Sequence, residues 1–186
     1  MKQIITFGEV LLRISPRGNK TFMQSNNVEF YFGGTELNVS ISIANFGGSV
    51  KHISAVSEDF IGDTAISYIR KFGVSTSSIV RSKRPLGVYF LEVGAVMRPS
   101  KISYNRSHSS FSQIIPSMVD WDKALRKGIW MHWTGITPAL SQGAYDTLKE
   151  GLKLAREKGL TVSADPTYRS GLWTYGQDAK TALIEL

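Results

Sequence analysis

The sequence predicts an α/β fold in which helices flank a parallel β-sheet. Short apolar runs typical of buried strands alternate with segments of helical periodicity through the first part of the chain. The glycine pair Gly33-Gly34 follows one apolar run and opens a helical one, so it marks a strand-to-helix turn. Two further strand-like runs between residues 87 and 106 are joined by a turn, which predicts a hairpin outside the parallel sheet.

The order of the expected elements follows from these patterns and from their caps. Strands are expected at residues 4–7, 10–14, 28–32, 50–56, 87–93, 102–106, 128–134 and 160–164. Helices are expected at 39–46, from about 65 to Gly73, from Asp120 to Lys127, from Ser141 to Gly159 and at 175–186. Asp120 and Ser141 are suited to cap the helices that follow them. The hairpin would pair with the region around residues 22–32 as a small lid.

Length and composition set the limits of the prediction. The 186 residues suffice for one domain with a core, or for part of a larger one. The absence of cysteine excludes disulfides and thiolate metal sites, and fits a reducing compartment. No apolar run approaches the roughly 20 residues that a membrane span needs. We therefore predict a cytoplasmic protein with no membrane partner.

The formal charge of +7 is compatible with nucleic acid, with an acidic substrate or with solubility alone. Basic residues are scattered, and aromatic residues do not alternate with them as a base-stacking surface requires. We therefore expect no nucleic-acid partner and favour a small anionic substrate. The histidines His52, His108 and His132 lack metal-ligand spacing, so no metal site is expected at them.

The turn at Gly33-Gly34 is the candidate binding element. Glycines allow φ > 0 and let another group approach the backbone N–H donors at a helix start, where a hydroxyl or an anion can bind. Asn38 would point at whatever lies over the glycines. An ordinary turn explains the pair equally well. Likewise, the hairpin aromatics Tyr89, Phe90 and Tyr104 could cover core, a subunit contact or a substrate cleft.

Taken together, several motifs resemble the ribokinase-like carbohydrate kinases, the PfkB family, and most closely their 2-keto-3-deoxygluconate kinase branch. The motifs are Gly8-Glu9 with Leu11-Leu12-Arg13 and Ser15-Pro16, Gly33-Gly34 with Glu36 and Asn38, Gly87-x-Tyr89 with Glu92, Tyr104-x-Arg106, Asp120-Trp121, Gly135-Ile136, and Tyr168-Arg169 with Leu172-Trp173. The resemblance implies that residues 1–186 are the N-terminal part of a ribokinase-like domain. Its lid strands would lie around 20–32 and 87–106, and the C-terminal half of the fold would be missing.

The resemblance also implies a function and a set of site residues. Such kinases phosphorylate a sugar hydroxyl with ATP and Mg²⁺, and here the substrate would be a sugar acid such as 2-keto-3-deoxygluconate. The implied substrate-binding residues are Gly33, Gly34, Asn38, Tyr89, Tyr104, Arg106 and Arg169. Thr167 and Arg169 would contact the nucleotide phosphates. A guanidinium suits a carboxylate or phosphate because it donates two parallel hydrogen bonds. A homodimer through the lid is expected.

Two departures from the family pattern qualify this expectation. Thr167 stands where the family usually has an Asn that helps to arrange phosphates and magnesium. The Gly-x-Gly-Asp motif, whose Asp takes the proton from the substrate hydroxyl, is absent from these 186 residues. No catalytic residue is therefore assigned, and the catalytic Asp is expected beyond Leu186. The alternatives are a non-catalytic sugar-binding or dimerisation fragment, or another sugar kinase such as a fructokinase.

Overall fold

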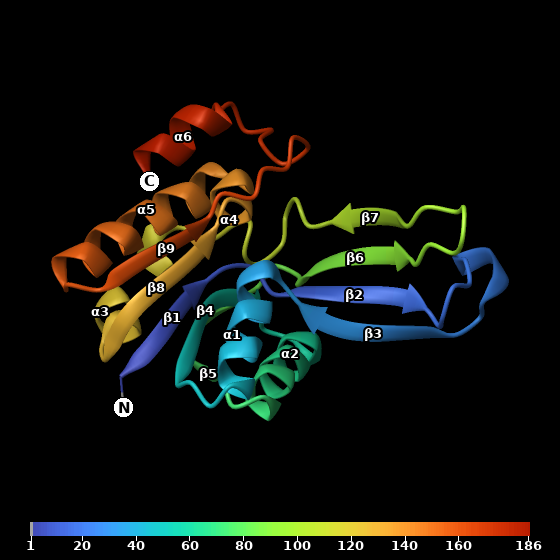
Figure 1. Cartoon of the computed structure of the whole chain (residues 1–186), viewed down its shortest axis with the longest axis horizontal. Helices are drawn as coiled ribbons and strands as arrows, with labels where there is room; N and C mark the ends of the chain where they lie inside the picture. Colours follow the sequence, from blue (N-terminus) through green and yellow to red (C-terminus); the bar gives the residue numbers. More distant parts are fainter. Residues whose placement is uncertain (1) are drawn as a thin grey trace.

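The large sheet of the protein is parallel, as predicted. The computed structural model describes residues 2–186 and contains a five-stranded and a four-stranded sheet side by side (Figure 1). The five-stranded sheet, called the large sheet below, has the order β5-β4-β1-β8-β9 with every neighbouring pair parallel. Its strands are β1 (Gln3–Phe7), β4 (Val50–Ser57), β5 (Ser75–Ser82), β8 (Gly128–Thr134) and β9 (Thr161–Asp165).

Helices cover the two faces of the large sheet (Figure 1). They are α1 (Thr35–Asn45), α2 (Phe60–Lys71), α3 (Trp121–Leu125), α4 (Ile136–Ala139), α5 (Gln142–Glu157) and α6 (Ala179–Glu185), with 3-10 turns η1 (Phe22–Gln24) and η2 (Pro116–Met118). The predicted caps are confirmed: Asp120 accepts a hydrogen bond from the Lys123 N–H, and Ser141 accepts one from the Ala144 N–H.

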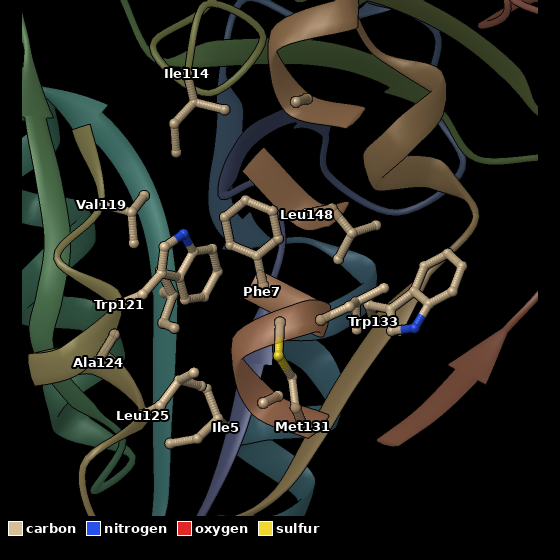
Figure 2. Packing of buried hydrophobic residues seen from close by; sticks show 14 of the residues in the cluster. Ile5, Phe7, Ile114, Val119, Trp121, Ala124, Leu125, Met131, Trp133 and Leu148 are labelled. Carbon is tan, nitrogen blue, oxygen red and sulfur yellow. The ribbon is translucent and has the colours of Figure 1, made fainter. Parts of the chain in front are cut away.

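Two hydrophobic clusters lie on opposite faces of the large sheet. One joins β1 and β8 to α3 and α5 through side chains that include Phe7, Trp121, Met131 and Leu148 (Figure 2). The other joins the sheet to α1 and α2 through Leu37 and similar residues. Every residue of β4 is buried, as expected of a parallel strand that is covered on both faces.

The second sheet, called the small sheet below, extends away from the helices (Figure 1). It has the order β3-β2-β6-β7, formed by β2 (Leu11–Pro16), β3 (Val28–Gly33), β6 (Gly87–Glu92) and β7 (Lys101–Asn105). The predicted hairpin is β6–β7. However, β6 pairs with β2 and not with β3, so the expectation that the hairpin pairs with the 22–32 region was wrong.

Other boundaries differ for local reasons. The strand β5 was not predicted at all, because Ser75–Ser82 is largely polar and lies at the sheet edge. The helix α1 begins at Thr35 and not near residue 39, directly after Gly34. The last helix begins at Ala179, where Asp178 caps it, and not at residue 175. No helix within residues 2–186 has the length and apolar character that crossing a membrane would require.

Candidate functional site

The candidate site lies where the small sheet joins the carboxyl ends of the large-sheet strands. After β1 the chain passes through Glu9 into β2, and after β3 it passes through Gly34 into α1. The strand β8 leads at Gly135 into α4, and β9 leads at Pro166 into a loop. In parallel α/β sheets, ligands bind beyond the carboxyl ends of the strands.

The Gly33-Gly34 turn is shaped by close backbone packing. The backbone of Gly34 is extended, with φ of 161°, so the turn does not use the left-handed conformation that glycine allows. A Cβ on Gly34 would lie 2.0 Å from the carbonyl oxygen of Glu9, which leaves no space for a side chain. A Cβ on Gly33 would instead lie 3.6 Å from Oδ1 of Asn38. The exposed Asn38 amide therefore lies beside Gly33.

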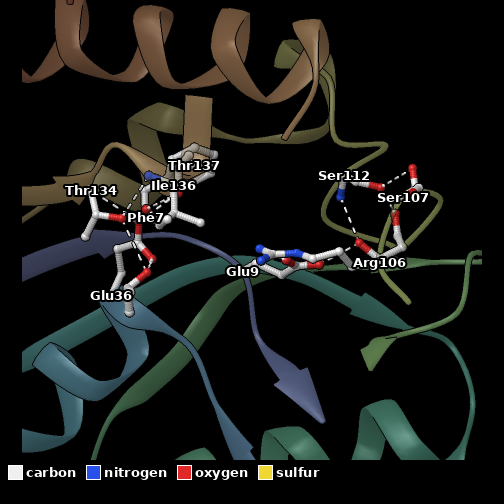
Figure 3. Close-up of polar contacts among 11 residues, drawn as sticks. Phe7, Glu9, Glu36, Arg106, Ser107, Ser112, Thr134, Ile136 and Thr137 are labelled. Atoms are coloured by element: carbon white, nitrogen blue, oxygen red, sulfur yellow. Dashed lines mark hydrogen bonds and ion pairs between the residues drawn. The ribbon is translucent and has the colours of Figure 1, made fainter. Parts of the chain in front are cut away.

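A buried ion pair joins the two sheets at this point. The Arg106 guanidinium pairs with the Glu9 carboxylate, and the two side chains are only 10% and 3% exposed (Figure 3). The Ser109 hydroxyl donates to the same carboxylate over 2.6 Å. Burial raises the pKa of Glu9, while the Arg106 charge and the Ser109 hydrogen bond oppose that rise. The pairing was not predicted. Because of it, Glu9 already occupies some of the N–H donors of the Arg106 guanidinium.

Two tyrosines extend the site along the small sheet. Tyr89 and Tyr104 are register partners on β6 and β7, and their ring centroids lie 5.5 Å apart. The guanidinium carbon of Arg106 lies 5.5 Å from the centroid of the Tyr104 ring. A Cβ on Gly87 would lie 2.6 Å from Oε1 of Glu9, so the start of β6 packs directly on the ion pair. The structure therefore brings Tyr89, Tyr104 and Arg106 together.

A second buried carboxylate, Glu36, fixes the turn from the other side. Its Oε1 accepts hydrogen bonds from the Thr134 N–H over 3.1 Å, the Thr134 hydroxyl over 2.8 Å and the Thr137 hydroxyl over 2.7 Å (Figure 3). The Thr35 hydroxyl donates to Oε2 over 2.7 Å. Glu36 thus ties the first turn of α1 to β8 and α4.

The comparison with known proteins identifies the family. The profile described as "pfkB family carbohydrate kinase" matches residues 1–185. The chain belongs to the pfkB family of carbohydrate kinases. The predicted family and its ribokinase-like α/β fold are thereby confirmed.

The relatives of the chain include one 2-dehydro-3-deoxygalactonokinase and two 2-dehydro-3-deoxygluconokinases. The chain is 29% identical to the 2-dehydro-3-deoxygalactonokinase of Haloferax volcanii, over 99% of this chain and 57% of that one. It is 28% identical to the 2-dehydro-3-deoxygluconokinase of Bacillus subtilis, over 91% of this chain and 52% of that one. The crystal structure of the 2-dehydro-3-deoxygluconokinase from Thermotoga maritima superposes with a TM-score of 0.90 and 41% identity, covering 94% of this chain and 53% of that one. The chain therefore spans about half the length of these relatives.

The residues expected at the nucleotide, Thr167 and Arg169, lie on the loop after β9. A Cβ on Gly135 would lie 2.7 Å from the Thr167 carbonyl oxygen, so this loop packs against the end of β8. Arg169 is exposed, and its guanidinium donates to the Tyr168 carbonyl over 3.1 Å. The Thr167 N–H donates to the Asp165 carboxylate over 3.1 Å. Within residues 2–186, no hydrogen bond or ion pair links Arg169 to Gly34 or Arg106. The structure thus gathers the substrate-side residues predicted from the sequence, but it does not join Arg169 to them.

The catalytic Asp that the resemblance places beyond Leu186 lies outside the described residues, so that expectation stays a prediction. Leu186 itself makes only structural contacts. It is the C-cap of α6, its N–H donates to the Ala182 carbonyl over 3.3 Å, and its own carbonyl accepts from the Arg156 guanidinium over 3.1 Å. Its apolar, half-buried side chain packs against the core cluster beside α5 and can neither take nor give a proton.

The side chains within residues 2–186 do not by themselves form a complete site for a nucleotide or a metal ion. No group of three or more acidic or histidine side chains within residues 2–186 is arranged to hold a metal ion. His52 is buried in β4 against the Thr6 hydroxyl at 2.7 Å, and burial lowers its pKa to about 3. Thr167 and Arg169 lie on one open loop and enclose neither a nucleotide nor magnesium by themselves.

Proposed function

We propose that the chain provides the sugar-binding side of an ATP-dependent kinase that phosphorylates a hydroxyl of a sugar acid such as 2-keto-3-deoxygluconate. The observation that carries the proposal is the unbroken set of contacts from Gly34 through Glu9 and Arg106 to the Tyr104 and Tyr89 rings. The names of two relatives and of a solved structure support an acidic sugar over a neutral one.

Each part of the site has a chemical role in this proposal. The Asn38 amide and the backbone N–H groups at the Gly33-Gly34 turn would donate to sugar hydroxyls at the start of α1. The Tyr89 and Tyr104 rings would cover the carbon skeleton of the sugar. Arg106 would present to the sugar-acid carboxylate the donors that Glu9 leaves open, since its Nε is buried without a partner.

Phosphoryl transfer also needs a base that takes the proton from the attacking hydroxyl. The family motif that supplies this base, Gly-x-Gly-Asp, does not occur in the 186 residues. We therefore expect residues 1–186 alone to give no steady-state turnover with the sugar acid and ATP. An assay that couples ADP production to 2-keto-3-deoxygluconate measures this. Robust turnover by the chain alone would contradict the assignment of the base to another polypeptide segment.

The competing proposal is a non-catalytic sugar-binding or dimerisation module, which the half-length match to the relatives makes worth testing. Titration calorimetry with the sugar acid and with ATP is the first measurement. The second is the coupled assay after addition of a polypeptide that carries the remaining half of a relative. Recovered turnover supports a kinase divided between two chains. Sugar-acid binding without ATP binding, and without any recovery of turnover, supports the module.

Another sugar kinase, such as a fructokinase, is distinguished through Arg106. The Arg106→Ala variant should weaken binding of 2-keto-3-deoxygluconate more than binding of fructose, because only the acid carries a carboxylate for the guanidinium. Equal losses for the two sugars would count against an acidic substrate.

The proposal includes a homodimer that forms through the small sheet. Phe30 and Phe90 are both register partners of Ile14, so they lie on one face of the sheet, and they are 61% and 37% exposed. The ring of Phe22 packs edge-on against Phe90 at 5.9 Å and widens the apolar face. An exposed aromatic surface of this kind is typical of protein–protein contacts.

A further inference from the structure

One row of side chains crosses the small sheet from edge to edge. Tyr31 on β3 is the register partner of Arg13 on β2, Arg13 is the partner of Tyr89 on β6, and Tyr89 is the partner of Tyr104 on β7. Register partners in adjacent strands point to the same face of a sheet. The four side chains therefore form one row, which we call the Tyr-Arg row.

The Tyr-Arg row faces the candidate site. Leu11 and Gly87 lie two residues before Arg13 and Tyr89 on the same strands, and they share the face because side-chain direction alternates along a strand. A Cβ on Gly87 would contact both Glu9 and Arg106. The opposite face packs on α2, since the Phe32 ring lies 5.5 Å from the Tyr68 ring.

Arg13 is held between two tyrosines. Its guanidinium carbon lies 4.3 Å from the centroid of the Tyr31 ring, within the range of a cation–π interaction. On the other side its register partner is Tyr89, and the Arg13 charge opposes the rise in the Tyr89 pKa that burial causes. The guanidinium therefore packs on the Tyr31 ring and lies beside Tyr89.

Arg13 differs from Arg106 in having no counter-charge. Arg106 pairs with Glu9, whereas no ion pair within residues 2–186 includes Arg13. The acid on the far side of Tyr31, Glu29, accepts the Tyr31 hydroxyl over 2.9 Å and pairs with Arg17. Moreover, Nε of Arg13 is buried and has no hydrogen-bond partner. A buried guanidinium donor that is left unpaired is unfavourable, and an anionic oxygen would satisfy it.

We propose that Arg13 is a specificity-determining residue that selects an anionic substrate at this site. Glu9 neutralises the charge of Arg106. Arg13 therefore supplies the positive charge that remains for an anionic ligand at the Tyr-Arg row. Its planar fork would bind the carboxylate of a sugar acid while Tyr89 and Tyr104 cover the sugar carbons. This inference rests on the proposed sugar-acid function and adds a contact residue to it.

Titration calorimetry on the full chain tests the inference with 2-keto-3-deoxygluconate and with fructose as the neutral probe. Loss of a charge-assisted hydrogen bond predicts that Arg13→Gln weakens the sugar acid roughly 10- to 100-fold. Fructose, if bound, should change by less than about threefold, because it offers no carboxylate. Arg13→Lys keeps the charge and should recover part of the affinity for the acid. Arg17→Gln, at the exposed end of the same strand region, is the matched control and should bind like the unaltered chain.

The outcomes separate the two proposals. If the unaltered chain binds no sugar acid, the proposed function fails, and this inference fails with it. If the chain binds the acid and Arg13→Gln binds it equally well, the function stands and the inference is overturned. Equal losses for acid and neutral sugar, with no recovery in Arg13→Lys, would assign Arg13 to packing and would also overturn it. Circular dichroism and thermal melting of each variant establish that it is folded.

Discussion

At the scale of single residues, two buried carboxylates hold the site together. Glu9 and Glu36 are 3% and 1% exposed. A buried carboxylate is tolerated only where it is paired or fully hydrogen-bonded. Glu9 meets this condition with Arg106 and Ser109, and Glu36 meets it with hydroxyl and N–H donors from three threonines. The two acids therefore determine how α1, β8 and the small sheet meet.

Replacing Glu36 by Ala should destabilise the fold by ~2–4 kcal/mol. The change leaves the buried N–H and hydroxyl of Thr134 and the hydroxyl of Thr137 without their acceptor, and each unsatisfied group costs ~1–3 kcal/mol, although relaxation recovers part of this. Urea denaturation gives the value. Glu36→Gln retains one acceptor oxygen and should lose less. Glu150→Ala, on the exposed surface of α5, is the control and should be near neutral.

Replacing Arg106 by Met should destabilise the fold by ~3–5 kcal/mol at neutral pH, because it leaves Glu9 buried without its cation. The loss should depend on pH. Burial already raises the pKa of Glu9 above its usual value near 4.5, and removal of Arg106 raises it further. Below pH 4.5 the carboxyl is protonated in both the folded and unfolded states, so the loss should be small there. It should grow as pH rises through the folded-state pKa.

Urea midpoints of Arg106→Met and the unaltered chain at pH 4.5 and pH 7.5 measure this difference. In the double variant Glu9→Gln with Arg106→Met, the loss should be smaller and should no longer change with pH. A loss that is equal at the two pH values would show that Glu9 and Arg106 are not coupled in this way.

The sequence predicted some of these residues and missed others for a physical reason. Gly34, Tyr89 and Arg106 could be named because each belongs to a short motif with its own residue chemistry. The Glu9–Arg106 pair could not be predicted, because its partners lie far apart in the chain and meet only through the pairing of β2 with β6 and of β6 with β7. For the same reason, the sequence does not indicate that Glu9 occupies part of the Arg106 guanidinium.

At the scale of elements, the strands that the sequence predicted are those in which apolar residues recur. The strands β1, β4 and β8 were predicted because each contains several apolar residues. The strand β5 was missed because an edge strand tolerates the serines of Ser75–Ser82. The place of β2 between β3 and β6 is a pairing between distant segments, which hydrophobic periodicity does not specify.

The turn between β3 and α1 permits a matched pair of glycine substitutions. In Gly34→Ala the new methyl would lie 2.0 Å from the Glu9 carbonyl oxygen, so the backbone must move. In Gly33→Ala the nearest atom would be 3.6 Å away, which is an ordinary contact. We expect Gly34→Ala to lose ~1–3 kcal/mol of stability and most sugar-acid binding, and Gly33→Ala to lose less than about 1 kcal/mol. Thermal melting and calorimetry measure the two effects, and similar values for both variants would contradict the packing argument.

At the scale of the whole molecule, a large parallel sheet carries a small sheet that projects from it, and the chain that forms them spans about half the length of its relatives. The proposed dimer buries the exposed aromatic face of the small sheet. Sedimentation velocity should show a dimer, and Phe30→Glu should weaken it about tenfold or more, because a charge then replaces a ring in the contact.

Phe46→Glu is the control for this dimer prediction, since Phe46 is 90% exposed at the end of α1, away from the small sheet. It should leave the dimer unchanged. A monomer at all concentrations, or equal effects of the two substitutions, would contradict a dimer through the small sheet.

The chain enters or leaves the small sheet at four places, and all of them lie at its inner end. They are the junctions before Leu11, after Gly33, before Gly87 and after Asn105. Any tilt of this sheet toward the parallel strands must be absorbed by backbone rotation at these junctions. Gly33 and Gly87 lie at two of these junctions. The other two junctions lie next to Glu9 and Arg106, which are paired with each other. Any such rotation must therefore preserve the contact between Glu9 and Arg106 or leave a buried charge without its partner.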